Sequence, residues 1–252
     1  MYISRKTSII IHQILDHWLP PIIRDSKWCM YPLFWIVFGS QARTFMGFKD
    51  RVAYRDSKGM KQIYENTASV HIQRQTDLTP ECVEKIEQCI LGGSVLDIAC
   101  GRGYLSGRLS PLYQVVAADM HIETQTVYRH SLVSFVQSSI TDLPFADGAF
   151  DTVVCAHTLE HITDIQKAVQ ELRRVTKKRL IIVVPKQRPY RYTFDLHVHF
   201  FPYAWSLELL LKKTEVSSRC ELVGGDWLYV DDGRFAISLG IGPCFDSLSP
   251  CQ

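Results

Sequence analysis

The sequence lacks the cysteine spacing of a redox or zinc motif, because none of its eight cysteines belongs to a CxxC pair. The cysteines also show no regular framework of the kind that small secreted domains use for disulfides. Cys100 lies in a glycine-containing turn and Cys155 in an apolar run. We therefore expect buried, reduced thiols and a cytoplasmic protein.

A strong charge of either sign is also missing. The 252 residues carry a net charge of +2, which is too mild to argue for nucleic acid or anionic lipid by itself. Basic residues cluster at 173–174 and 177–179, where we expect the solvated end of a helix. With 46% hydrophobic residues the chain can bury a substantial core, and its length suits one domain with an extension.

A signal peptide is not expected, since the start of the chain has no small-residue cleavage site. Residues 7–19 have the apolar spacing of an amphipathic helix. Residues 28–39 are rich in tryptophan, tyrosine and phenylalanine, but they are too few to span a bilayer and Pro32 interrupts them. Three interpretations stay open for this stretch: a lid on the main domain, a peripheral contact with a membrane interface, or a dimer contact.

One stretch, Val95 to Ser106, organises the rest of the chain. Residues 94–99 are short and apolar and predict a buried strand, while residues 104–110 can start a helix. Between them, Gly101 and Gly103 allow the backbone to approach a ligand closely and to adopt positive φ. Strand, glycine turn and helix form the geometry of a nucleotide-binding crevice. On its own this pattern leaves a nicotinamide cofactor open.

Alternating strands and helices follow on both sides of this stretch. Thr79-Pro80-Glu81 is a strong helix start, with a threonine cap and a proline at the first position. Further strands are expected at 113–120, 135–140, 152–156, 179–185, 219–223 and 234–240, with helices at 164–175 and 206–212. Asp231-Asp232-Gly233 is expected to make the turn between the last two strands.

These motifs resemble, in order, those of the class I S-adenosylmethionine (SAM) methyltransferases. Asp97 fills the acidic place of the first motif, Ala99 replaces its first glycine, and residues 143–151 match the LPF-x-DG-x-FD signature, followed by LEH at 159–161. The resemblance covers about residues 79–240. It implies an α/β fold with a Rossmann-like, seven-stranded, mostly parallel sheet, helices on both faces and an N-terminal helical lid. We expect a lid extension at 1–78, the methyltransferase domain at 79–242 and a tail at 243–252.

The resemblance implies SAM as the cofactor. The acid at the end of the second strand, Asp119, is placed to accept hydrogen bonds from the ribose hydroxyls. Ser139 stands where the family usually has an aspartate that accepts from the adenine amino group, with Asp142 as a nearby substitute. The full set of expected cofactor-binding residues is Asp97, Ala99, Gly101, Gly103, Asp119, Met120, Ser139, Ile140 and His157.

Histidines supply the candidate catalytic groups. His157, His197 or His199 could act as a general base, because histidine titrates near neutral pH. Alternatively, His157, Glu160 and His161 share a helix face and, with His197 or His199, could bind a divalent metal. Certain RNA 2′-O-methyltransferases and quinone O-methyltransferases have a similar Glu-x-x-Glu-His helix, in which His157 would replace the first glutamate. A structural role is the third interpretation, and we predict no bound metal.

The function that these patterns predict is methyl transfer from SAM to an oxygen, nitrogen or carbon of a small aromatic or lipid-like acceptor. No DNA partner is expected. The alternatives are a metal-dependent O-methyltransferase, a SAM-binding protein without catalysis, and a nicotinamide oxidoreductase. Peripheral membrane contact through residues 28–38 is expected only if the membrane interpretation of that stretch holds.

Overall fold

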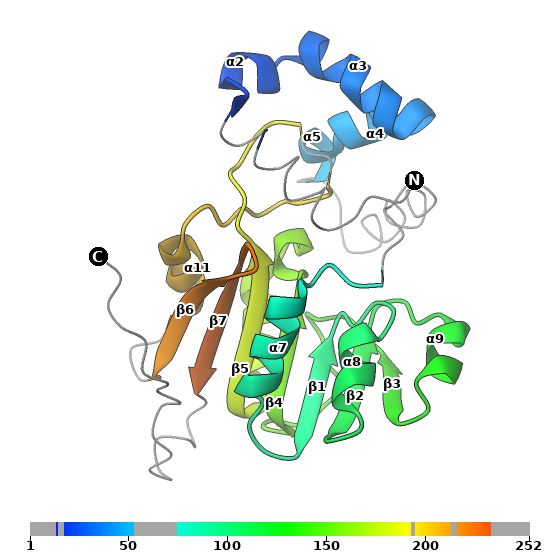
Figure 1. Cartoon of the computed structure of the whole chain (residues 1–252), viewed down its shortest axis with the longest axis vertical. Helices are drawn as coiled ribbons and strands as arrows, with labels where there is room; N and C mark the ends of the chain where they lie inside the picture. Colours follow the sequence, from blue (N-terminus) through cyan, green and yellow to red (C-terminus); the bar gives the residue numbers. More distant parts are fainter. Residues whose placement is uncertain (1–13, 15–17, 53–74, 193–194, 213–215, 233–252) are drawn as a thin grey trace.

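The computed structural model describes residues 14, 18–52, 75–192, 195–212 and 216–232. Seven strands form one sheet in the order β3-β2-β1-β4-β5-β7-β6 (Figure 1). The strands are β1 (Ser94–Ile98), β2 (Gln114–Asp119), β3 (Val133–Gln137), β4 (Phe150–Ala156), β5 (Thr176–Pro185), β6 (Ser218–Val223) and β7 (Asp226–Asp232). The first five strands are parallel, and β7 is antiparallel to both β5 and β6. This confirms the expected seven-stranded, mostly parallel Rossmann-like sheet.

Two hydrophobic cores lie on opposite faces of the sheet. Successive strand residues alternate between them: Val95 belongs to one core, and Leu96 and Ile98 belong to the other. Helices α7 (Pro80–Cys89) and α8 (Tyr104–Leu109) cover the first face, and α10 (Ile165–Val175) and α11 (Ala204–Leu211) cover the second. Helix α9 (Thr124–Arg129) and the short 3-10 helix η3 (Leu159–His161) complete the domain. Because both faces of the sheet are buried, the sequences of the strands are nearly continuous apolar runs.

An N-terminal segment, residues 18–52, forms a further helical layer. It contains α2 (Pro21–Arg24), α3 (Lys27–Phe38), η2 (Gly39–Gln41), α4 (Ala42–Met46) and α5 (Phe48–Val52). These helices lie beyond the carboxyl ends of the parallel strands (Figure 1). The expected break at Pro32 is wrong, because α3 runs through it. Pro32 lies on the exposed side of the helix, where water can satisfy the carbonyl that loses its backbone donor.

A third core joins this segment to the loop after β5. Met30, Phe34 and Phe38 of α3 pack with Tyr190 and Tyr192. The rings of Phe38 and Phe45 stack, with their centroids 3.8 Å apart. The aromatic residues of the segment are therefore divided between an internal core and the surface, and the core side contacts the loop that follows β5.

The turn between the last two strands differs from the expected one. β7 spans Asp226–Asp232, so Asp231 and Asp232 lie within a strand and do not form a turn. Gly224 and Gly225 make the connection instead, with φ values of 58° and 94°. Two consecutive residues with positive φ match the twist of a tight hairpin, and glycine adopts them without a steric penalty. The strand expected at 234–240 lies outside the described residues.

Two other expectations fall wholly or mostly outside the described residues: the helix at 7–19 and the tail at 243–252. Within the described part of the chain, no helix combines the length and apolar character needed to cross a membrane. All six cysteines that the structure describes are free thiols.

Candidate active site

The glycine turn after β1 holds three residues in left-handed conformations. Ala99, Gly101 and Gly103 have φ values of 55°, 51° and 69°. The N–H of Ala99 donates to the carbonyl of Ala118 in β2 at 2.7 Å, which fixes the start of the turn. Glycine suits the two later positions, whereas an alanine side chain at φ 55° is strained. The first glycine place of the motif is thus a strained position in this chain.

We expect Ala99→Gly to raise the free energy of unfolding by about 0.5–1 kcal/mol, since relief of left-handed strain outweighs the added flexibility of the unfolded chain. Denaturant unfolding of both proteins measures the difference. Ala118→Gly is the matched control, because Ala118 is a buried strand residue and its replacement should destabilise. An Ala99→Gly protein less stable than the wild type would contradict the strain.

Asp119 lies directly beside this turn. Its carboxylate accepts hydrogen bonds from the N–H of Gly101 at 2.8 Å and from the N–H of His121 at 3.0 Å. A Cβ built on Gly101 would have no atom within 4 Å, so the backbone there borders open space. A carboxylate at the end of β2 and a bare backbone edge at the end of β1 fit the ribose and the methionine part of SAM.

Asp97 is buried in β1 and does not face this open space. Its carboxylate accepts a hydrogen bond from the hydroxyl of Ser106 on α8. Burial, together with the charge of Asp119, raises the pKa of Asp97 to about 6, although the Ser106 hydrogen bond lowers it. The contact fastens α8 to β1. Asp97 therefore holds in place the two elements that the glycine turn connects.

The residues expected around adenine occupy different environments. Met120 is partly exposed at the end of β2, whereas Ile140 is buried in the core beneath the sheet edge. Both Ser139 and Ile140 follow β3, which ends at Gln137, and do not belong to the strand. The Ser139 hydroxyl lies 2.9 Å from that of Thr141, and Ser139 forms an isolated bridge with Asp142.

His157 follows β4 and is held between two buried carboxylates. Its Nε2 lies 3.1 Å from Oδ2 of Asp226, and its Nδ1 lies 3.6 Å from Oε1 of Glu160. Its φ of 50° is strained for a non-glycine residue. Ala99 and His157 are the two non-glycine residues with positive φ in the described ranges, and each directly follows one of the neighbouring strands β1 and β4.

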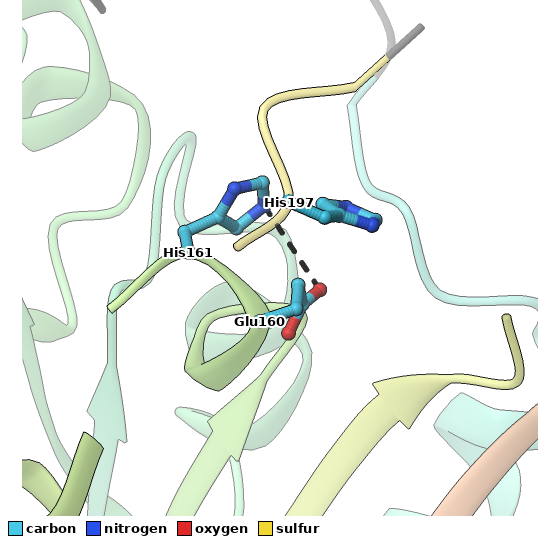
Figure 2. A group of neighbouring side chains, drawn as sticks. All are labelled: Glu160, His161 and His197. Carbon is cyan, nitrogen blue, oxygen red and sulfur yellow. Dashed lines mark ion pairs between the residues drawn. The ribbon is translucent and has the colours of Figure 1, made fainter. Parts of the chain in front are cut away.

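The structure brings Glu160 and His161 of η3 together with His197 from the loop after β5 (Figure 2). The rings of the two histidines meet edge to face, with their centroids 4.6 Å apart. Burial opposes ionisation of Glu160, but His157, His161 and His197 together lower the pKa of its carboxyl below the ordinary value. His199 is not in this cluster, since its Nε2 donates to the carbonyl of Ile162. Of the two loop histidines that the metal interpretation left open, the cluster contains His197 and not His199. His157 is not in the cluster either, because it precedes η3 with a φ of 50° and does not share the helix face expected for it.

Arg174 is a site-shaping residue that the sequence interpretation missed. Its guanidinium donates to the carbonyls of Leu143 and Phe145 and to the carboxylates of Asp147 and Glu171. It therefore clamps the LPF-x-DG loop onto α10. Arg173 and Arg174 do lie in the last turn of α10, as expected. The expected solvation is wrong for Arg173, which pairs with the buried Asp231 at 2.7 Å.

Two further missed residues orient histidines. Asp226 begins β7 and contacts His157, and Gln187 accepts from Nδ1 of His197. Neither stands in a motif, and each approaches its partner only through the folded sheet. Both side chains are polar and buried, and a buried polar group needs a hydrogen-bond partner. This burial, which only the structure gives, indicates their roles.

A surface hollow lies at the other end of the sheet, lined by Gly93, Pro111, Tyr113 and Asp151 among others. It opens at the amino ends of β1, β2 and β4. Ligands of open α/β sheets bind beyond the carboxyl ends of the strands, so the turn and histidine cluster form the candidate site.

Comparison with known families supports the resemblance. Residues 96–184 match the family model described as "Methyltransferase domain". A crystal structure of a SAM-dependent methyltransferase from Aquifex aeolicus is similar in fold, with a TM-score of 0.50 and 22% identity over 71% of this chain and 98% of that one.

Two curated relatives show how far the similarity extends. Over 98 residues the chain is 36% identical to the 2-phytyl-1,4-naphtoquinone methyltransferase of Trichormus variabilis, a match that covers 34% of this chain and only 43% of that protein's length. It is 27% identical to the ubiquinone/menaquinone biosynthesis C-methyltransferase UbiE of Coxiella burnetii over 71% of this chain and 81% of that protein. The family match and the sheet order together confirm the expected class of domain.

Proposed function

Because the chain carries a class I SAM-dependent methyltransferase domain, we propose that it transfers a methyl group from SAM to a small aromatic or lipid-like acceptor. The observation that carries the proposal is the contact between Asp119 and Gly101, which places the acid of β2 beside the bare turn of β1. SAM supplies an electrophilic methyl group on a sulfonium, so the protein contributes mainly position.

Each part of the turn has a distinct role in this proposal. Gly101 and Gly103 let the backbone approach the methionine part, Asp119 binds the ribose hydroxyls and Met120 packs on the adenine. Asp97 and Ala99 shape the turn without contributing a free polar group to the cofactor. Ser139 or Asp142 accepts from the adenine amino group.

Two observations favour a quinone-like or similarly apolar acceptor. The two relatives described above are named as quinone methyltransferases. In addition, the N-terminal segment packs its aromatic core on Tyr190 and Tyr192 of the loop after β5. We propose that this segment is the lid over the acceptor, as expected for residues 1–78.

We propose His157 as the proton acceptor when the acceptor group must lose a proton. Asp226 orients its ring at 3.1 Å, and the Glu160 carboxylate would stabilise the imidazolium that forms. His197 and His199 are engaged with Gln187 and the Ile162 carbonyl, so they position the loop in this proposal.

Calorimetric titration with SAM and S-adenosylhomocysteine, followed by an acceptor screen, tests the proposal. Micromolar binding and acceptor-dependent formation of S-adenosylhomocysteine from reduced quinones or phenols are expected. Binding without turnover on any acceptor would favour a SAM-binding protein. Thermal stabilisation by NAD but not by SAM would favour an oxidoreductase.

We also propose that α3 contacts a membrane surface while Met30, Phe34 and Phe38 hold it to the third core. Its outer face exposes Trp28, Ile36 and Trp35 by 89%, 75% and 60%. Lys27 is exposed at the start of α3, whereas the Arg24 side chain is largely buried over the Tyr190 ring and lies 4.0 Å from Asp25, which stands between α2 and α3. Exposed tryptophan beside a lysine is typical of an interfacial helix, and such a surface suits an anionic bilayer.

The double variant Trp28→Ser/Trp35→Ser is expected to bind anionic phospholipid vesicles about tenfold or more weakly than the wild type, because two interfacial anchors are lost. Co-sedimentation with vesicles of mixed phosphatidylcholine and phosphatidylglycerol measures the change. Trp205→Ser is the matched control, since Trp205 is also exposed but lies on α11. Equal vesicle binding by all three proteins would rule out contact through α3.

A further inference from the structure

We propose that Glu160, His161 and His197 form a binding site for a divalent transition metal ion. One carboxylate oxygen and one nitrogen of each ring all lie within 4.8 Å of one another (Figure 2). Donors in a tetrahedral site are about 3.4 Å apart when the metal bonds are near 2.1 Å. Small rotations of the three side chains are therefore enough to close the site around an ion.

The Glu160 carboxylate is the first reason to expect an ion. The residue is wholly buried, and neither of its oxygens accepts a hydrogen bond within the described structure. Nδ1 of His157 lies 3.6 Å from Oε1 of Glu160, and Nε2 of His161 lies 3.9 Å from the same oxygen. A buried carboxylate that lacks hydrogen bonds is costly, and coordination of a cation would compensate for that cost.

The second reason is the orientation of the two rings. Nδ1 of His161 lies 3.1 Å from the carbonyl of Leu196, which only accepts, so Nδ1 carries the proton. Nδ1 of His197 faces the amide oxygen of Gln187, whose amide nitrogen already donates to Tyr190 and Asp195. In both rings the lone pair is then on Nε2. Metal-binding histidines are usually held in this way by an acceptor on their other nitrogen.

Backbone hydrogen bonds keep the two ligand segments together. The N–H groups of Val198 and His199 both donate to the carbonyl of Glu160, at 2.8 and 3.0 Å. The loop after β5 is thereby fastened to η3 next to His197. The site is consequently pre-arranged by the fold, and the apoprotein can be studied as a folded chain.

The donor set indicates the class of ion. Two imidazoles and one carboxylate match zinc sites that keep a fourth position open, and also suit other first-row divalent ions. Magnesium and calcium prefer all-oxygen sets, so they fit less well. With three protein ligands, the fourth position of a tetrahedral ion would be left for water or for an oxygen of a bound molecule.

Metal titration of the full-length, untagged protein after EDTA treatment tests the site without any methyl-transfer assay. We expect one equivalent of Co²⁺ to bind and to give visible ligand-field bands, without the strong near-ultraviolet band of cobalt bound to thiolate. Zn²⁺ at 100 times its Kd should raise the melting temperature by about 5–10 °C. Absence of both effects in the wild type would overturn the proposal.

Substitutions locate the ion. His197→Gln and Glu160→Gln should each weaken Co²⁺ binding by about tenfold to a hundredfold. His199→Gln is the matched control and should bind as the wild type does, because His199 lies two positions along the same loop and outside the cluster. Near-ultraviolet circular dichroism shows whether each variant is folded. Wild-type affinity in folded His197→Gln and Glu160→Gln proteins would place the ion elsewhere and overturn the proposal. SAM binding, measured separately, decides the proposed function independently.

Discussion

Replacement of Asp119 by alanine is expected to weaken SAM binding by about 2–4 kcal/mol, which corresponds to about 30-fold to 1000-fold in Kd. The carboxylate lies at the end of β2 beside Gly101, where it can accept two charge-assisted hydrogen bonds from the ribose. Alanine removes both. Calorimetric titration with SAM and S-adenosylhomocysteine measures the loss, which should be similar for the two ligands because they share the ribose.

Asp119→Asn separates the ribose contact from the structure of the turn. It keeps one side-chain oxygen that can still accept from Gly101, so the fold should be preserved while the charge is lost. Glu87→Gln is the companion control and should bind SAM as the wild type does, since Glu87 is a surface acid of α7 that pairs with Arg108 and belongs to no part of the proposed cofactor site. Unchanged SAM affinity in Asp119→Ala, in a protein with a wild-type melting profile, would remove Asp119 from the cofactor site.

Much of the sheet could be predicted from the sequence because both of its faces are buried. Apolar runs such as residues 94–98 and 179–185 have no other stable location in a soluble domain than between two layers of helices. Helix α7 was equally predictable, since its cap is local: Thr79 accepts from the N–H of Cys82, and Pro80 follows it. Such signals depend only on neighbours in the sequence.

The turn between the last strands could not be chosen correctly from composition. Asp231-Asp232-Gly233 and Gly224-Gly225 are both good turn sequences. Residues distant in the sequence determine which pair forms the turn. Asp231 is buried against Arg173, and Asp232 lies 2.7 Å from Arg179 of β5, so both acids belong to the sheet. Two arginines that looked like surface charge thus hold two acids inside the sheet.

The same limit applies to the site. The motifs assigned Gly101 to the methionine part of SAM and Asp119 to the ribose, and the structure adds that the Asp119 carboxylate accepts from the N–H of Gly101. The sequence also placed His157, Glu160 and His161 on one segment as possible metal ligands. It did not indicate whether His197 or His199 would join them. That choice depends on Gln187, which orients His197, and on the Ile162 carbonyl, which engages His199.

The strained residues add a further link between fold and site. Ala99 directly follows β1 and His157 directly follows β4. In the strand order β3-β2-β1-β4-β5, the strands before and after this pair lie on opposite sides of it. In doubly wound sheets this switch point is where ligands bind. Strained backbone is common at ligand sites, where the surrounding packing holds a conformation that the ligand needs. The strain at Ala99 and His157 agrees with a site at this place.

Asp97 is expected to make the stability of this protein fall as pH rises from about 4 to 7. Its pKa is about 6 in the folded protein, above its ordinary value of 3.8, because burial disfavours the charged form. The folded chain therefore holds this proton more tightly than the unfolded chain. The resulting stabilisation is complete below pH 3.8 and is lost as pH rises through 6. Its full size is about 3 kcal/mol.

Denaturant unfolding of the wild type and Asp97→Asn at several pH values from 4 to 7.5 isolates this contribution, because other groups cancel in the difference. The free energy of unfolding of the wild type, relative to the variant, should decline by about 2.5 kcal/mol over that range, because Asp97 of the unfolded chain is already more than half ionised at pH 4. Ser106→Ala provides the control: it removes the hydrogen bond that lowers the pKa of Asp97, so the decline should move to higher pH. Parallel pH profiles for wild type and Asp97→Asn would mean that the pKa of Asp97 is not raised by folding, so groups other than Ser106 would also have to stabilise its carboxylate. The anchoring of α8 to β1 would then need a different electrostatic explanation.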